Sequence, residues 1–434
     1  MPLDALEARV ADHIAAREDD LVALLQRLVG FDSVESGGQL AALQGFLAER
    51  LARVGAEVSL GEPAAELVAG HPYVPDGFDF AGRPQLVARF PGTGGGPTLL
   101  ACGHVDVVSA DPRDAWTAEP FGGERRDGAV FGRGACDMKG GVAAMTFAAT
   151  ALAELGVRLR GDLLVNTVSE EETTGAGGLV SARTLRADAA IVPEPSALAV
   201  WVACRGSLLC TIDVEGRGGH AGVPPRHPAQ GGAVSAIDKA ALLLEALRRL
   251  NEEWALRPRH PHLSPAHAVV TAIHGGEWMV SYPARCRIEV HVEYLPGQEG
   301  VEAELEDWIA RAAAGDPWLR DHPPAVAWLL GGVPPAEVDP AQPIVQALLA
   351  AERDLGREPR LGGMENWSDA ATLVVEAGIP AVNYGPGDIA RAHTADEHVP
   401  VADVVACAQG IAVAAMRFCG VAWPGSSENR RIRA

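Results

Sequence analysis

The sequence LLVNTVSEEETTGAGG (residues 163–178) joins a strand pattern to three consecutive acids. Its first half is apolar and has no helical period, which predicts a buried strand of a parallel sheet. Ligands of open α/β sheets bind outside the carboxyl ends of the strands, where Glu170, Glu171 and Glu172 follow in this chain. Three adjacent carboxylates repel one another unless a cation or a shared proton is present. Taken alone, the segment leaves two interpretations open, a cation site and an acidic surface loop.

The composition indicates a globular protein with more than one core. The chain has 434 residues, of which 48% are hydrophobic and 21% are charged. This length exceeds what one ordinary core accommodates, so two domains are expected. The formal net charge of -21 argues against nucleic-acid and anionic-membrane partners, because neither would be attracted electrostatically. Bound divalent cations would offset part of this charge.

The cysteines and the N-terminus bear on the cellular compartment. The seven cysteines are scattered and include no CxxC pair. They predict reduced, buried thiols and argue against a disulfide framework or a thiolate zinc site. The N-terminus carries charges in place of an apolar signal-peptide core, and no stretch approaches the roughly 18 uninterrupted apolar residues of a membrane span. The sequence therefore predicts a cytoplasmic protein.

Two other predicted strands also end in possible metal ligands. Residues 98–106 form an apolar run that passes into His104 and Asp106, and residues 189–192 are followed by Glu194. Imidazole is a common metal ligand, and a carboxylate two residues away can accept a hydrogen bond from the second ring nitrogen and fix the tautomer. A single His-x-Asp is weak evidence, because a polar strand end without a metal is the more common case.

A glycine-rich turn supplies a further acid. Residues 132–141 contain Asp137 and lead into an alanine-rich helix predicted for residues 142–155. The glycine spacing fits neither a P-loop nor a dinucleotide fingerprint, and a carboxylate suits a cation better than a phosphate. Four segments of one chain thus place metal-type side chains at strand ends or turns, which favours a shared metal site over separate polar loops.

The middle of the chain predicts a second, smaller domain. From residue 207 onward the strands alternate like half-exposed antiparallel strands. The expected order is that of a βαββαβ insert. Its elements are predicted at residues 208–216, 230–252, 268–274, 286–294, 299–314 and 325–330. We therefore expect a discontinuous domain of residues 1–206 and 332–434, interrupted by residues 207–331, with a disordered tail over residues 424–434.

Six motifs, taken in order, resemble one known family. They are His104-Val105-Asp106, Gly134-x-x-Asp137-Met138-Lys139-Gly140-Gly141, Glu170-Glu171-Glu172, Pro193-Glu194-Pro195, Gly219-His220-Ala221 and Gly385-Pro386-Gly387 with Ala392-His393. The series is similar to that of the M20 metallopeptidases and deacylases, which include acetylornithine deacetylase, succinyl-diaminopimelate desuccinylase, aminoacylase-1 and glutamate carboxypeptidase. The resemblance covers nearly the whole chain.

The resemblance implies a fold and a cofactor. It implies an α/β, zinc-exopeptidase-like catalytic domain with an inserted ferredoxin-like lid or dimerisation domain. It also implies two divalent metal ions per chain, zinc first and cobalt or manganese as alternatives, with a cis peptide bond after the bridging acid Asp137. By resemblance, His104, Asp137 and Glu194 hold one metal, and Asp137, Glu172 and His393 hold the other. Such N and O ligands suit zinc, and two cations about 3.5–4 Å apart need a bridging oxygen.

The same resemblance assigns catalytic roles to three residues. Glu171 is the general base that takes a proton from water and passes it to the leaving amine. Asp106 orients His104. His220 resembles the histidine that reaches the partner subunit's active site and stabilises the oxyanion, although a turn residue without a role remains the alternative. The implied assembly is a homodimer formed through the inserted domain.

Two positions depart from the family pattern. Many members carry an asparagine and an arginine in the inserted domain that bind a substrate carboxylate, and this chain has Val280 and Glu293 there. An acid would repel a carboxylate, so we expect a neutral or amine-bearing substrate, although Arg205, Arg285 or Arg287 could supply a positive contact from elsewhere.

The resemblance thus implies a dinuclear-zinc amidohydrolase that cleaves an N-acyl amino acid or N-acyl amine, a small-molecule substrate. A metallo-exopeptidase with the same site is one alternative. A non-catalytic binding protein of the same fold is the other.

Overall fold

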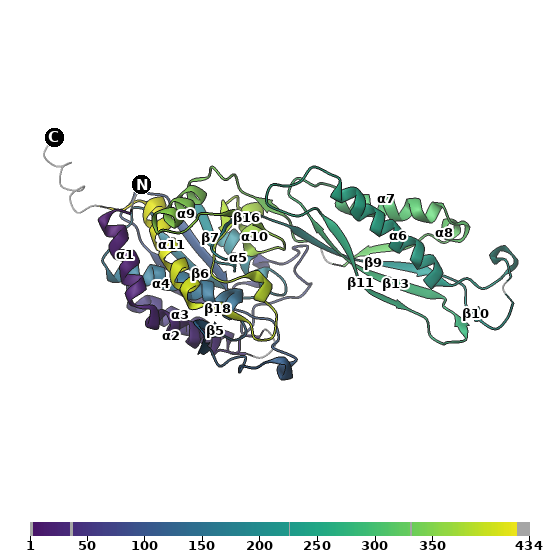
Figure 1. The fold of residues 1–434 in the computed structure, drawn as a ribbon, viewed down its shortest axis with the longest axis horizontal. Helices are drawn as coiled ribbons and strands as arrows, with labels where there is room; N and C mark the ends of the chain where they lie inside the picture. The colour runs from purple at the N-terminus through teal and green to yellow at the C-terminus, as the bar shows by residue number, and fades with distance from the viewer. Residues whose placement is uncertain (1–2, 35–37, 225, 330–331, 423–434) are drawn as a thin grey trace. The chain divides into compact units, whose positions relative to one another are not determined.

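The computed structural model describes residues 3–34, 38–224, 226–329 and 332–422, which divide into two compact units (Figure 1). The first unit comprises Met1–Ala203, Ala336–Met364 and Ser368–Ala434, and the second comprises Cys204–Pro335 and Glu365–Trp367. The predicted insert, residues 207–331, lies within the second unit. The tail for which we expect disorder lies outside the described residues.

The first unit is built on a mixed sheet, which confirms the predicted α/β class. The strand order is β1-β2-β6-β3-β7-β17-β8-β15, and β16 pairs with β8. Strands β6, β3, β7 and β17 are parallel neighbours, whereas β1, β2 and β8 pair antiparallel. The strands are β1 (Glu57–Gly61), β2 (Gln85–Phe90), β3 (Leu99–His104), β6 (Leu163–Val168), β7 (Ala189–Val192), β8 (Val200–Cys204), β15 (Ala336–Glu337), β16 (Leu361–Met364) and β17 (Ala381–Asn383).

Two groups of helices pack on this sheet. Helices α4 and α11 contact each other and β3, and α1, α2 and α9 pack against them, whereas α5 and α10 pack together against β6, β7 and β17. Burial of β3 and β6 along their whole length matches the apolar runs from which they are predicted. The helices are α1 (Ala5–Ala16), α2 (Glu18–Val29), α3 (Leu40–Arg53), α4 (Gly140–Glu154), α5 (Ala176–Thr184), α9 (Pro343–Asp354), α10 (Asp369–Ala377) and α11 (Val401–Cys419).

Helix α11 is long and apolar enough, by length and composition, to cross a membrane, although sequence reading found no such stretch. Most of its apolar window, 72%, is buried inside the first unit, where it contacts α4, α9 and α1. This burial is what a core helix shows.

A small antiparallel sheet, missed at the sequence level, lies beside these helices. It consists of β4 (Glu124–Arg126), β5 (Ala129–Phe131) and β18 (His398–Pro400) in the order β18-β5-β4. Strands of three residues are too short to show a period. Their pairing matters because it brings two distant segments together near residues 132–139.

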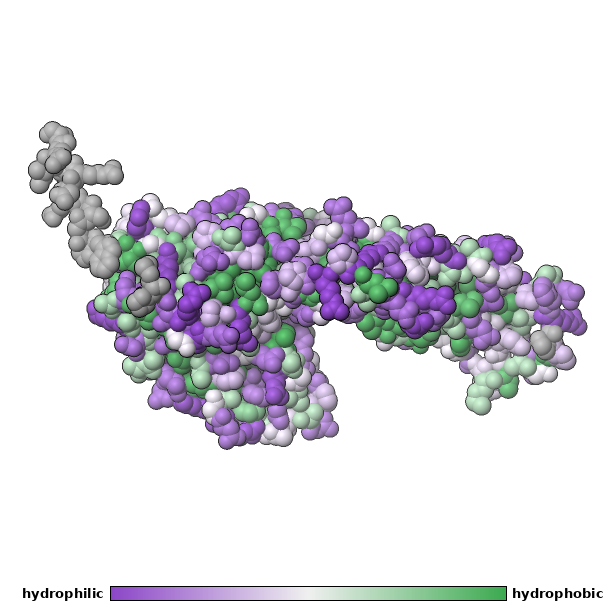
Figure 2. All heavy atoms as spheres, turned by 45° about the horizontal axis from the view of Figure 1, so that its top comes forward, coloured by the Kyte–Doolittle hydropathy of each residue, from purple (hydrophilic) through white to green (hydrophobic). Residues whose placement is uncertain are grey.

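The second unit contains the predicted βαββαβ series. Its four-stranded antiparallel sheet has the order β11-β13-β9-β14, and α6 and α7 pack together beside it. Helix α6 begins later than predicted because Ser235 caps it through the backbone N–H of Asp238. Figure 2 shows hydrophilic and hydrophobic residues interspersed on the visible face of this unit. The elements are β9 (Gly206–Glu215), β10 (Gly219–His220), α6 (Ala236–Ala255), β11 (His267–Gly275), β12 (Ser281–Tyr282), β13 (Arg285–Tyr294), α7 (Val301–Ala314), α8 (Pro317–Asp321) and β14 (Ala325–Trp328).

Candidate metal centre

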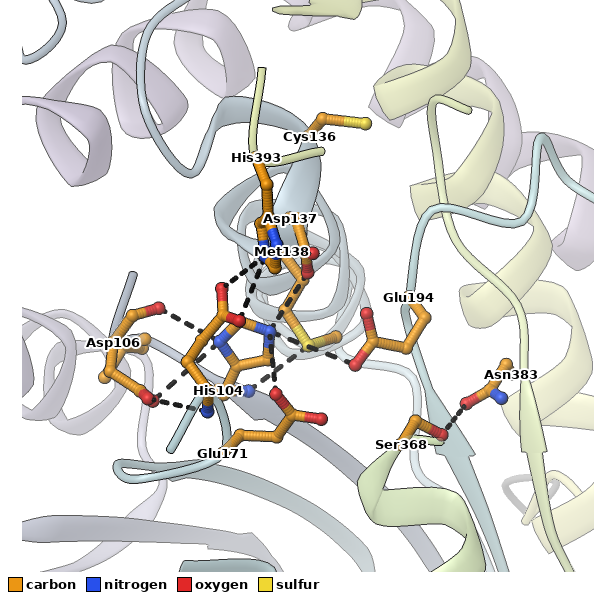
Figure 3. A network of polar contacts seen from close by, with 12 residues as sticks. His104, Asp106, Cys136, Asp137, Met138, Glu171, Glu194, Ser368, Asn383 and His393 are labelled. Atoms are coloured by element: carbon orange, nitrogen blue, oxygen red, sulfur yellow. Dashed lines mark hydrogen bonds and ion pairs between the residues drawn. The ribbon is translucent and has the colours of Figure 1, made fainter. Parts of the chain in front are cut away.

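Three neighbouring parallel strands deliver polar side chains to the carboxyl-terminal end of the large sheet. Figure 3 shows His104, Glu171 and Glu194 gathered in one cluster. Strand β3 ends at His104, β6 is followed by the acidic run, and β7 is followed within two residues by Glu194. Because β6, β3 and β7 are adjacent and parallel, their carboxyl ends lie side by side. The predicted ligands on these strands are therefore close in space although 90 residues separate the first from the last.

Asp137 lies between the two histidines. It sits in the turn Ala135–Lys139, and its peptide bond to Met138 is cis, as the resemblance implies. Asp137 Oδ1 is 3.1 Å from His104 Nε2, and Oδ2 is 3.5 Å from His393 Nε2. His393 comes from the loop before β18, and its Nε2 is 3.0 Å from Glu172 Oε2. One carboxylate thus contacts two imidazoles from opposite ends of the chain.

Glu171 and Glu194 complete the cluster at slightly longer range. Glu171 Oε2 and Glu194 Oε1 are each 3.9 Å from His104 Nε2. Ligand atoms of His104, Asp137 and Glu172 all lie within 4.8 Å of one another. The structure therefore brings together the five predicted ligands and the predicted base within the first unit.

Burial shifts the pKa of every acid in the cluster, and neighbouring charges add to this shift or oppose it. Burial, reinforced by neighbouring acids, raises the pKa of Glu171 and Glu194 well above the ordinary value. Burial also acts on Asp137, but hydrogen bonds from His104 and His393 outweigh it and lower the pKa of Asp137. Hydrogen bonds to Asp137 and Glu172 raise the pKa of His393 to about 10. The cluster thus favours bound positive charge.

The atoms that orient His104 differ from those expected. The ring Nδ1 lies 3.0 Å from the backbone carbonyl oxygen of Asp106 and 3.8 Å from its carboxylate Oδ1. The other carboxylate oxygen of Asp106 accepts the backbone N–H of Glu172 at 3.1 Å. Asp106 therefore contacts two predicted ligands, the ring of one and the main chain of the other.

The first of the three consecutive acids lies apart from the others. Glu170 is fully buried and has a positive φ of 71°, and its carboxylate forms an ion pair with Arg83 at 2.5 Å. This partner could not be predicted from the sequence, because Arg83 lies in the long glycine- and proline-rich stretch before β2.

His220 belongs to the second unit. It pairs with Ser281 where β10 meets β12, and it is exposed, with its Nδ1 accepting the backbone N–H of Gly222 at 3.0 Å. Its part in the reaction remains a prediction. Glu293, in the same unit, is 7% exposed; its Oε1 lies 3.0 Å from His291 Nε2 and its buried Oε2 makes no hydrogen bond to the described residues.

Sequence reasoning missed two sets of polar residues near the cluster. Asp369, the first residue of α10, is buried, and neither carboxylate oxygen has a hydrogen-bond partner among the described residues. Ser368 before it donates to Asn383 at 3.0 Å (Figure 3). Arg133 and Glu397 form a buried ion pair at 2.6 Å. The burial of Asp369 could not be predicted from the sequence, because its sequence context resembles an ordinary helix start.

The donor set fits divalent cations. It consists of two imidazoles and three carboxylates, the nitrogen and oxygen ligands that zinc accepts. Glu194 Oε1 and Asp106 Oδ1 are buried and make no hydrogen bond to the described residues. A buried carboxylate without a partner is costly, and a cation at this position would remove that cost.

Comparison with known proteins supports the same family. Residues 100–417 match the peptidase family M20/M25/M40. The chain is 32% identical over 355 residues to the N-formyl-4-amino-5-aminomethyl-2-methylpyrimidine deformylase of Bacillus subtilis (strain 168), covering 75% of this chain and 81% of that protein. It is 33% identical over 343 residues to the acetylornithine deacetylase of Myxococcus xanthus, covering 77% and 84%.

A solved structure extends the comparison to the whole fold. The YXEP protein of Bacillus subtilis, described as a dinuclear metal binding peptidase from the M20 family, aligns with a TM-score of 0.64 at 14% identity, covering 93% of this chain and 99% of that one. At this identity the likeness concerns the fold alone. The chain belongs to the peptidase family M20/M25/M40, and it is a hydrolase of amide bonds.

Proposed function

We propose that this protein is a dinuclear-zinc amidohydrolase that cleaves the amide bond of an N-acyl amine or N-acyl amino acid. The observation that carries the proposal is the position of Asp137, whose two carboxylate oxygens contact His104 and His393 separately. A carboxylate placed between two imidazoles is what a pair of bridged cations requires.

The five ligands divide into two sets that share Asp137. His104 and Glu194 would complete one set, and Glu172 and His393 the other. Cations bound there would polarise a substrate carbonyl and acidify a water molecule. The solved relative described as a dinuclear metal binding peptidase supports two ions, and zinc is our first choice, with cobalt or manganese as alternatives.

Glu171 is the proposed general base. It is adjacent to Glu172 in sequence, but its carboxylate makes no hydrogen-bond contact with His393 like that of Glu172. A raised pKa suits a group that must both accept and return a proton near neutral pH. Glu171 would take a proton from the attacking water and deliver it to the amine as the amide bond breaks. His220 would stabilise the oxyanion in the site of a partner subunit.

We propose that the substrate is neutral or bears an amine and that it lacks a carboxylate. Glu293 places a buried acid where many family members carry an arginine, and its Oε2 is without a hydrogen-bond donor among the described residues. The relative named as a formyl-aminomethylpyrimidine deformylase acts on a compound whose name includes an N-formyl amine and no carboxyl group. Both observations favour an N-formyl or N-acyl amine over an N-succinyl amino acid.

The proposed assembly is a homodimer formed through the second unit, and the proposed location is the cytoplasm. The partner in catalysis is a small molecule, with no role for nucleic acid or membrane.

A metallo-exopeptidase is the second candidate, since the solved relative of the same fold is described as a peptidase. It would use the same cluster with a different pocket. A binding protein without catalysis is disfavoured, because Glu171 and all five ligands are present.

The test is a substrate panel on one preparation. We would compare hydrolysis of N-formyl, N-acetyl and N-succinyl amines and of dipeptides by the zinc-loaded protein. Turnover of N-formyl or N-acetyl amines without a free carboxylate is the expected result. Preferential release of amino acids from dipeptides would replace the deacylase proposal with the exopeptidase.

A further inference from the structure

Glu397 is a fully buried acid that the proposed chemistry does not use. It follows His393 by four residues and immediately precedes β18. Pairing of β18 with β5 places it beside the glycine-rich turn, where its backbone oxygen accepts the N–H of Gly132 at 2.8 Å. The residue therefore joins two segments that are 260 residues apart in sequence.

The carboxylate of Glu397 holds the main chain of the turn. Its Oε1 accepts the backbone N–H of Cys136 at 2.9 Å and that of Asp137 at 3.0 Å. Its Oε2 forms the ion pair with Arg133, whose Nε also donates to the carbonyl oxygen of Ser109. Both oxygens of this carboxylate therefore have hydrogen-bond donors, in contrast to the acids of the cluster that have an oxygen without a donor among the described residues.

These two N–H groups set the position of Asp137. The Asp137 side chain contacts His104 with one oxygen and His393 with the other. Both contacts depend on the position and orientation of the Asp137 main chain. The loop that carries His393 is held at a second point, where Asp396 Oδ1 accepts the backbone N–H of Thr117 at 2.7 Å. Glu397 therefore links the bridging acid to the loop of the second histidine.

We propose that Glu397, with Arg133 as its counter-charge, is a positioning residue that fixes Asp137 relative to His393 for binding two cations. This rests on the proposed dinuclear site. Residues that orient metal ligands from behind typically change metal affinity 10–100-fold when replaced. A merely structural ion pair would change stability and leave the bound metals as they were.

The experiment compares two buried acid–arginine pairs of the first unit. Glu397→Gln keeps the size of the side chain and one acceptor oxygen but removes the charge that pairs with Arg133. Glu352→Gln is the matched control, because Glu352 is also buried and pairs with Arg357 at 2.6 Å while contacting none of the candidate ligands among the described residues. Cobalt(II) is the probe, since its visible spectrum reports ligand geometry.

The expected result is a cobalt affinity about 10–100-fold weaker in Glu397→Gln, with an altered spectrum, and a wild-type affinity and spectrum in Glu352→Gln. Wild-type cobalt affinity and spectrum in folded Glu397→Gln would overturn the proposal. If Glu397→Gln does not fold, Arg133→Lys tests the same contact, and a wild-type spectrum and affinity in that variant would overturn it equally. Failure of the wild-type protein to bind cobalt would instead refute the dinuclear site itself.

Discussion

The two units differ in where most of their unpartnered buried acids and their exposed ion pairs lie. In the first unit, Asp106, Glu194 and Asp369 are buried, and each has at least one carboxylate oxygen that makes no hydrogen bond to the described residues. In the second unit, Asp213 and Arg287 pair across neighbouring strands with about half of each side chain exposed. A buried charge without a protein partner is costly. We therefore expect such a charge to persist where a bound ligand stabilises it. The contrast supports the proposal that metal ions bind in the first unit, and Glu293 is the exception in the second unit, because its buried Oε2 has no hydrogen-bond donor among the described residues.

The largest effect is expected when the proposed base of the first unit is replaced. Glu171→Gln should lower kcat about 10²–10⁴-fold, because an amide accepts no proton from water at neutral pH. Metal content should stay at the wild-type value, since Glu171 is not a proposed ligand. Steady-state kinetics and metal analysis on one sample check both points, and wild-type turnover would rule out this role for Glu171.

A smaller effect is expected from the second unit. His220→Ala should lower kcat about 10²–10³-fold if His220 stabilises the oxyanion. Because the side chain is exposed, Tm should not change. His274→Ala is the matched control, since His274 is another exposed histidine of this unit. Equal rates for both variants and the wild type would remove His220 from the mechanism.

The unpartnered acid Asp369 predicts a pH dependence of stability. Burial raises its pKa from 3.8 to about 7. The folded state therefore keeps a proton that the unfolded state has lost, and the resulting stability is complete below pH 3.8 and is lost as pH rises through about 7. In chelator, Asp369→Asn should flatten the fall in unfolding free energy over this range by up to about 1.4 kcal/mol per pH unit. Urea unfolding at several pH values measures the slope, and parallel curves for the two proteins would contradict the expectation.

The smallest effect is expected at the exposed pair. Asp213→Asn should leave Tm and kcat at wild-type values, because exposed ion pairs contribute little and salt screens them. A clear loss of Tm, measured by thermal unfolding at low and high salt, would mean that surface charge in the second unit matters more than its exposure implies.

Much of the cluster could be predicted because its signals are local. The strands that end at His104, before Glu194 and before the acidic run are apolar runs followed at once by ligand-type residues. Adjacent parallel strands then bring these ends together. The βαββαβ order of the second unit was likewise readable from alternating strands and amphipathic helices.

The rest depends on contacts that leave no local trace. The contact of Arg133 with Glu397 spans 264 positions and depends on three-residue strands that have no readable period. His104 is oriented mainly by a backbone carbonyl, which any residue could supply. The unpartnered state of Asp369 appears only when α10 and α5 pack together.

The most direct test of the dinuclear site is a metal titration of chelator-treated protein, with bound ions and turnover of an N-acyl amine followed together. We predict that binding saturates near two zinc or cobalt ions per chain and that turnover recovers in parallel. Absence of binding, with no turnover after either metal is added back, would show that the ligand cluster persists without its chemistry and would favour the binding-protein alternative.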